Sequence, residues 1–101
     1  MNGARLQCQA AGQFSLSGEL SFASVPELVE AGEQLFDSVD VISVDLADVG
    51  RSDSAGLALL VSWVRQARQL DKRLSFQHVP AQLLGLARVS GVDHILPLDM
   101  S

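Results

Sequence analysis

The chain of 101 residues has little of what nucleic-acid-binding and disulfide-stabilised proteins depend on. It contains one cysteine, no tyrosine and 5% aromatic residues, and 7 Lys and Arg stand against 12 Asp and Glu, for a formal net charge of −5. Nucleic-acid binders need a cationic surface and often aromatic stacking platforms, so we expect no nucleic-acid partner. The single Cys8 excludes an internal disulfide, and one cysteine with two histidines predicts no metal site.

Long hydrophobic runs are also missing. The longest apolar stretch, residues 55–64, is interrupted by Ser62 and is far shorter than the about 20 residues that cross a bilayer. The first residues, Met-Asn-Gly-Ala-Arg-Leu-Gln, contain no apolar segment typical of a signal peptide. We therefore expect a cytoplasmic protein without direct membrane insertion, which reaches the cytoplasmic face of a membrane only through a partner.

The hydrophobic pattern predicts a single α/β domain over residues 1–101. A chain of this length with 48% hydrophobic residues can bury one core. After an N-terminal hairpin, predicted strands and helices alternate, which indicates a mixed β-sheet of about four to five strands with helices packed on it. Helices are predicted from about 24 to 36, 54 to 70 and 81 to 89, and strands at 39–46, 74–78 and 95–98.

The N-terminal third carries two specific expectations. Leu6, Cys8 and Ala10 alternate with polar residues before a turn at 11–13, so they are predicted to form the buried face of the first strand. Ser24, followed three residues later by Glu27, forms a capping box, which predicts the start of the first helix.

The central and final strands are predicted from composition. Residues 39–46 are β-branched and mostly apolar, which is typical of a strand covered on both faces. Residues 47–52 are expected to form a loop. Residues 95–98 are expected to form an edge strand, because Pro97 lacks the N–H that a central strand needs.

Motifs of catalysis are not found in the sequence. No phosphate-binding loop, dinucleotide fingerprint or nucleophile elbow occurs, and His78 and His94 are interpreted as surface or packing residues. Four cationic residues lie around the end of the long helix: Arg65, Arg68, Lys72 and Arg73. Cations at this end interact favourably with the helix dipole, and we favour this interpretation over a phosphate or lipid site. We expect neither enzymatic activity nor a cofactor.

The segment where the buried strand passes into the long helix is the candidate functional site. Ser52, Asp53 or Ser54 can each act as the N-cap of that helix. Ala55 and Gly56 keep the first turn small, and Gly56 costs about 1 kcal/mol of helix propensity relative to alanine. Two explanations stay open: the glycine allows tight helix–sheet packing, or the bare first turn admits the backbone of another protein.

The same segment, Asp53-Ser54-Ala55-Gly56-Leu57, resembles the signature of STAS domains, the family of anti-sigma-factor antagonists and of the C-terminal domains of sulfate transporters. Three further segments resemble this family in the same order, so that the resemblance covers nearly the whole chain: 16–20, 44–46 and 86–92. The resemblance implies the STAS fold. Ser54 matches the position that a partner kinase phosphorylates in the antagonists, whereas Ser21 stands where they often carry aspartate.

Within the family, a stand-alone chain of this size most resembles the non-enzymatic accessory subunits of phospholipid-transporting ABC transporters. That resemblance implies the ATPase subunit as the partner. The predicted contact surface comprises the helix start and the loop beside it: Ser52, Asp53, Ser54, Ala55, Gly56, Phe22 and Ser24. Phe22 is either an apolar anchor for the partner or buried under its own fold. Two other functions remain open, an antagonist regulated by phosphorylation of Ser54 and a module that binds a small anion at the helix start.

Overall fold

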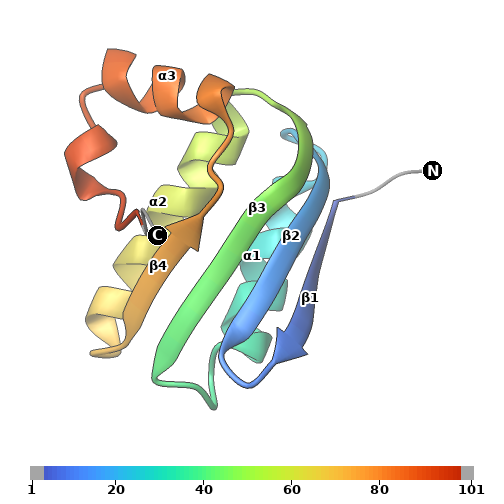
Figure 1. Ribbon diagram of the computed structural model, residues 1–101, viewed down its shortest axis with the longest axis vertical. Helices are drawn as coiled ribbons and strands as arrows, with labels where there is room; N and C mark the ends of the chain where they lie inside the picture. The colour runs from blue at the N-terminus through green and yellow to red at the C-terminus, as the bar shows by residue number, and fades with distance from the viewer. Residues whose placement is uncertain (1–3, 99–101) are drawn as a thin grey trace.

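The computed structural model describes residues 4–98. Its elements follow one another as strand, strand, helix, strand, helix, strand, helix and a short 3₁₀ helix (Figure 1). They are β1 (Arg5–Ala10), β2 (Gln13–Leu20), α1 (Val25–Leu35), β3 (Val41–Ser52), α2 (Ser54–Gln69), β4 (Arg73–Gln77), α3 (Ala81–Val89) and η1 (Asp93–Ile95). Among these elements, no helix is long and apolar enough to span a bilayer.

The four strands form one mixed sheet in the order β1-β2-β3-β4. β1 and β2 are an antiparallel hairpin, as predicted, and its turn contains Gly12 at φ +75°, a conformation that glycine adopts without steric cost. β2 pairs in parallel with β3, and β3 in parallel with β4. The predicted α/β architecture with a mixed sheet is confirmed, and the carboxyl ends of β2 and β3 lie at the same edge.

The core lies between the sheet and the helices α1 and α2, which cover one face of it (Figure 1). Alternate residues of β3 are therefore buried, among them Val44 and Leu46, which are fully inaccessible. Ser43 and Asp45 alternate with these buried residues, lie on the open face and are half-buried. The expectation that this strand is covered on both faces is wrong, because no helix of residues 4–98 packs on its second face.

β3 also extends beyond its predicted end. Residues 47–52, expected to form a loop, continue the strand because β2 offers a pairing partner along its whole length. Ser17 pairs with Asp48 and Leu20 with Ser52, and two register shifts absorb the irregular spacing. The long helix therefore begins directly where the central strand ends, with only Asp53 between them.

A cluster of aromatic side chains fills the space between α1 and α2. Phe36 packs edge-to-face against both Phe14 and Trp63, with ring centroids 5.0 and 5.4 Å apart. Trp63 is 1% exposed, and Gly32 makes room for its indole: a Cβ there would lie 3.0 Å from Cε2 of the tryptophan and closer still to Nε1. That Nε1 has no hydrogen-bond partner within the described residues. Trp63 is therefore a residue of the core.

The start of α1 differs from the predicted capping box. Ser24 occupies the N-cap position, but its side chain makes no hydrogen bond to the helix. Its hydroxyl instead donates to the carbonyl of Glu19 at 3.0 Å and accepts from the N–H of Ser21 at 3.0 Å. The backbone at Ser24 is already helical (φ −94°, ψ −28°), so the hydroxyl faces back into the preceding loop rather than towards the helix N–H groups.

Both ends of the chain show further differences. Cys8 and Ala10 are exposed: β1 is an edge strand, and Leu6 is its one buried residue. The predicted strand at 95–98 is reduced to a single parallel bridge between Leu98 and Phe76, preceded by η1.

The end of α3 agrees with its prediction. Gly91, at φ +74°, donates to the carbonyl of Arg88, and Val92 donates to that of Ala87, which together form a Schellman motif.

The basic cluster contains one residue with a structural role. Lys72 lies between α2 and β4, and its ammonium donates to the carbonyls of Phe36, Asp37 and Val39 at 2.9, 2.8 and 2.7 Å. Carbonyls at the end of a helix have no intrahelical donor. The Lys72 ammonium supplies hydrogen-bond donors to the carbonyls at the end of α1 and holds the following loop against α2. This contact supports the structural interpretation of the cluster over a phosphate or lipid site.

Candidate functional site

The candidate site lies at the junction of β3 and α2, beside the carboxyl end of β2. Asp53 is the N-cap of α2: its backbone is extended (φ −104°, ψ −165°) and its carboxylate accepts a hydrogen bond from the N–H of Ala55 at 2.8 Å. Its own N–H donates to the carbonyl of Leu20 at 3.2 Å, which ties the helix start to β2. Of the three N-cap candidates, the structure selects Asp53.

Three of the predicted contact residues face inward. Ser52 is 5% exposed and Ala55 is 3% exposed, and Gly56 is also buried. A Cβ at Gly56 would collide with Oγ of Ser52 and would lie 3.0 Å from Cβ of Leu20. The idea that Ala55 and Gly56 leave room for a partner is therefore wrong. The bare first turn of α2 packs against the end of β2 and β3 of the same chain.

Ser54 remains at the surface, as the first residue of α2. Because Asp53 supplies the cap, the Ser54 hydroxyl is not needed for it, and it makes no hydrogen bond to any side chain or backbone group in residues 4–98. Both its proton and its lone pairs are available to another molecule. Ser54 thus offers a donor and an acceptor beside the exposed Asp53.

Phe22 is the largest exposed apolar side chain at this end of the sheet. It follows β2 in the loop that leads to α1 and is 76% exposed, so it is not buried under its own fold. The loop that carries it is held by the hydrogen bonds of Ser24 and by the bond from Ala23 N–H to the Ser21 hydroxyl at 3.3 Å. Ser24 thus stabilises the loop itself, whereas the exposed side chain of Phe22 is accessible to another molecule.

A polar hollow of about 260 Å³ opens beside the helix start. Its lining includes the carboxylate-bearing Glu19 and Asp53, the guanidinium-bearing Arg51, and Gln82, whose Oε1 accepts from the Ser52 N–H at 3.3 Å. Two acidic groups outnumber one cation, so the charge balance opposes a phosphate or other anion. The small-anion function weighed from the sequence gains no support here.

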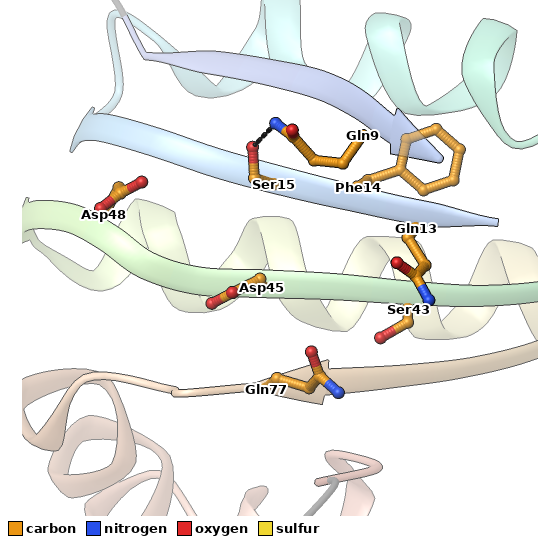
Figure 2. A pocket seen from close by; sticks show the side chains of 8 residues that line it. All are labelled: Gln9, Gln13, Phe14, Ser15, Ser43, Asp45, Asp48 and Gln77. Atoms are coloured by element: carbon orange, nitrogen blue, oxygen red, sulfur yellow. Dashed lines mark hydrogen bonds between the residues drawn. The ribbon is translucent and has the colours of Figure 1, made fainter. Parts of the chain in front are cut away.

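A second hollow, of about 390 Å³, lies on the open face of the sheet (Figure 2). Sequence reasoning missed it because β3 was expected to be covered on both faces. Gln9 donates to the Ser15 hydroxyl at 2.8 Å across β1 and β2, and Asp45 and Gln77 contribute from β3 and β4. The polar side chains at alternate positions of each strand were the signal that could have revealed it.

Asp45 has the one resolved pKa shift of the described residues. Partial burial acts to raise the pKa of Asp45, but the N–H of Ala47 at 2.8 Å and the imidazole of His78 at 2.9 Å together lower it below 3.8. Hydrogen bonds and a neighbouring cation stabilise the charged carboxylate. His78 itself adopts a left-handed conformation (φ 55°), and the pair joins β3 to the end of β4. Within residues 4–98 no group of three or more His, Cys, Asp and Glu side chains is placed to hold a metal ion.

Comparison with known proteins assigns the family. The family model described as the MlaB STAS domain matches residues 6–97. The chain belongs to the STAS-domain family. No sequence of a curated protein matches it significantly.

Solved structures share the STAS fold at low sequence identity. An anti-sigma factor antagonist from Mycobacterium paratuberculosis has a TM-score of 0.79 at 19% identity, over 100% of this chain and 87% of that one. The anti-sigma factor antagonist SpoIIAA in its unphosphorylated form has a TM-score of 0.72 at 16% identity, over 98% of this chain and 90% of that one. The phosphorylated form of the Bacillus cell fate determinant SpoIIAA gives 0.71 at 14% identity, over 98% and 93%.

Proposed function

We propose that this STAS domain is a non-enzymatic accessory subunit of an Mla-type phospholipid ABC transporter, in which it binds the ATPase subunit, MlaF. In this role the protein acts at the cytoplasmic face of the inner membrane of a Gram-negative bacterium and supports the lipid asymmetry of the outer membrane. The observation that carries the proposal is the match of the MlaB STAS domain to residues 6–97, which includes every helix and nearly every strand residue.

The geometry of the helix start supports binding to a protein. Ser54 presents a free hydroxyl, Asp53 an exposed carboxylate, and Phe22 a large apolar side chain, all at the end of the sheet where β2 and β3 finish. Exposed aromatic residues surrounded by polar groups are typical centres of protein–protein interfaces. The contact surface that we propose is therefore narrower than the seven residues suggested by the sequence.

The contacts of the site favour binding over catalysis. A serine nucleophile needs a general base within hydrogen-bond reach. The Ser54 hydroxyl makes no hydrogen bond in the described part of the chain, and the Nδ1 of His78 is bound to Asp45 on the open face of the sheet. The exposed groups at the helix start, Ser54, Asp53 and Phe22, can bind polar and apolar groups on the surface of a partner.

Co-purification of the chain with the MlaF-like ATPase encoded in the same genome tests the proposal. We expect the two purified proteins to form a stable complex, and we expect Ser54→Glu to weaken it at least about tenfold, because a charge is desolvated at the interface. Ser54→Thr keeps the hydroxyl and serves as the matched control. Failure of the unmodified chain to bind the ATPase would refute the function, and full binding by a folded Ser54→Glu variant would refute the site.

An anti-sigma-factor antagonist regulated by phosphorylation of Ser54 is the second candidate. The fold shared with SpoIIAA and the exposure of Ser54 favour it. A phosphate would add about −1.5 to −2 charges at a helix start, which the helix dipole favours and the adjacent Asp53 opposes. Incubation with a cognate kinase, followed by intact-mass measurement of the chain and of Ser54→Ala, distinguishes this function from the first.

A further inference from the structure

The outer edge of β1 is open to another strand. β1 is the first strand of the sheet, and in residues 4–98 it pairs with β2 alone (Figure 1). Every second residue of such an edge strand directs its N–H and C=O away from the sheet. The opposite edge is partly covered, because the N–H of Phe76 in β4 donates to the carbonyl of Pro97 at 2.9 Å and Leu98 forms a bridge with Phe76. The sheet can therefore be extended at β1.

The sequence of β1 does little to prevent such an extension. Natural proteins protect edge strands with lysine, proline, inward-pointing charges or bulges. β1 contains neither Lys nor Pro, and Arg5 is its one charged residue. Its register with β2 is regular from Arg5 to Cys8, and an irregularity follows between Cys8 and Ala10. The irregularity shortens the open edge but leaves residues 5–8 able to pair.

The distribution of charge favours contact between two copies of this chain at β1. The net charge is −5, and a net charge of one sign keeps copies of a protein apart. All 12 acidic residues lie from Glu19 onwards, so residues 5–18 of the hairpin contain Arg5 as their one charged side chain. Two copies that meet along β1 bring no carboxylates of this segment together.

An antiparallel pair of two β1 strands is also self-complementary. Residues directly opposite each other in an antiparallel pair point to the same face of the sheet, so a two-fold axis through Gln7 places the two Gln7 side chains opposite each other. Leu6 of one copy then lies opposite Cys8 of the other on the helix side. Arg5 lies opposite Gln9 on the open face. No like charges face each other in this register.

The pairing covers side chains that the fold of one copy leaves open. Cys8 is exposed, although its partner in β2, Phe14, is 3% exposed on the same face of the sheet. In the β1 pair, Cys8 packs against Leu6 of the second copy. The exposed Gln7 has an amide that both donates and accepts, so it can bond to its own copy across the axis.

We propose that two copies of this chain associate through an antiparallel β1–β1 pair centred on Gln7, which joins their two four-stranded sheets into one. The inference goes beyond the proposed function and does not depend on it. Because both copies use the same strand, the contact closes on itself and stops at two copies. A contact made by one short strand is small, so we expect a weak dimer that depends on concentration.

Cys8 reports this contact directly, because it is the only cysteine of the chain. In the register centred on Gln7, the two Cys8 Cα atoms lie two residues along the strand and one strand spacing apart, a distance of about 8 Å. A short bismaleimide is therefore expected to join two native chains. The control is Cys8→Ser combined with Leu70→Cys, which carries its one thiol at an exposed position outside β1 and should give little crosslinked product.

An isosteric substitution tests the register. Gln7→Glu places two carboxylates opposite each other at the two-fold axis, and Gln7 is exposed, so the variant is expected to remain folded, as verified by circular dichroism. Gln69→Glu makes the same chemical change at an exposed position of α2 and gives the same net charge. Sedimentation equilibrium measures the dimer Kd at chain concentrations up to about 1 mM. We expect Gln7→Glu to raise Kd at least about fivefold and Gln69→Glu to change it less than about twofold.

Three outcomes would overturn the proposal. The first is a chain that remains monomeric up to about 1 mM. The second is a thiol at position 70 that crosslinks as efficiently as Cys8, since this would place the contact elsewhere or make it non-specific. The third is an equal effect of Gln7→Glu and Gln69→Glu on Kd, because general repulsion between acidic chains would then explain both. Binding of the MlaF-like ATPase is measured separately, so its failure would leave the β1 contact unaffected.

Discussion

Gly56 packs directly against the side chain of Ser52, across the turn that joins β3 to α2. A Cβ at Gly56 would collide with the Ser52 Oγ and would press on Leu20 from the neighbouring strand. Ser52 is held in turn, because its N–H donates to Gln82 and its hydroxyl donates to the carbonyl of Asp53 at 3.2 Å. The close approach of helix and sheet at this point fixes where the exposed Ser54 stands.

Gly56→Ala is expected to destabilise the protein although alanine is the better helix former. Helix propensity would favour alanine by about 1 kcal/mol, whereas overpacking a tight site costs about 1–3 kcal/mol. We expect a net loss of up to about 2 kcal/mol in the free energy of unfolding, measured by urea denaturation. Gly85→Ala, in the middle of α3 with nothing within 4 Å of the added carbon, is the control and should stabilise by about 0.5–1 kcal/mol.

The cause can be isolated with a second substitution. Ser52→Ala removes the oxygen nearest to the added methyl group, so it should recover part of the loss in the Gly56→Ala background. Equal stability changes at Gly56 and Gly85 would show that the close packing at the helix start has no energetic consequence.

Features that depend on neighbours in the chain were predicted well from the sequence. The limits of α3, at residues 81–89, follow from local hydrophobic spacing. The limits of β3 depend instead on β2, a non-local partner that no local pattern of residues 47–52 indicates. Likewise, the open face of β3 is decided by where α1 and α2 pack.

The candidate site was predicted in part for the same reason. The sequence indicates a helix start at 52–54, but the choice of Asp53 as the cap depends on the backbone angles that the bond to Leu20 sets. The inward orientation of Gly56 depends on the distance between α2 and β2, which spacing along the chain does not contain. The exposure of Phe22 also depends on tertiary packing, so sequence reasoning left it open.

Lys72→Met is expected to destabilise the fold at the end of α1. The substitution keeps the apolar stem of the side chain and removes the ammonium that donates to three carbonyls. Charged hydrogen-bond donors lost from half-buried acceptors cost about 1–3 kcal/mol in total, and we expect a loss in this range by urea denaturation. Arg68→Met, in the same basic cluster but at an exposed position, should change stability by less than about 0.5 kcal/mol. Similar effects of the two substitutions would argue against a specific role of Lys72.

Removal of the imidazole next to Asp45 is expected to raise the pKa of that carboxyl group. In the native protein His78 and the Ala47 N–H hold the pKa of Asp45 below 3.8. His78→Asn removes the imidazole, and asparagine tolerates the left-handed backbone at this position (φ 55°). NMR titration of the Asp45 carboxyl carbon measures the shift directly.

The lowered pKa of Asp45 also predicts the direction of a pH effect. A carboxyl group with a lower pKa in the folded state than in the unfolded state binds fewer protons when folded. Its contribution to stability is therefore present above pH 3.8, the ordinary value, and is lost as the pH falls through the folded-state pKa. The acid side of the unfolding profile should be shallower in His78→Asn, and identical profiles would contradict the assigned cause. The side chains of His78 and Asp45 are 62% and 40% exposed, so added salt should reduce the difference between the unfolding profiles of the native protein and His78→Asn.

Asp53 allows the structural and the binding roles of the helix start to be separated. Its carboxylate caps α2 through the N–H of Ala55, so Asp53→Ala should lower the free energy of unfolding by about 1 kcal/mol. Asp53→Asn retains a capping oxygen and should leave stability nearly unchanged, while it removes the exposed negative charge beside Ser54. If the partner binds the Ser54 hydroxyl, removal of the neighbouring charge should alter the affinity of Asp53→Asn for the ATPase. Its free energy of unfolding should stay nearly the same. Urea denaturation and calorimetry on both variants measure the two quantities independently. Equal affinity of Asp53→Asn and the unmodified chain would mean that the aspartate serves α2 alone, and that the interface depends on the hydroxyl and on Phe22.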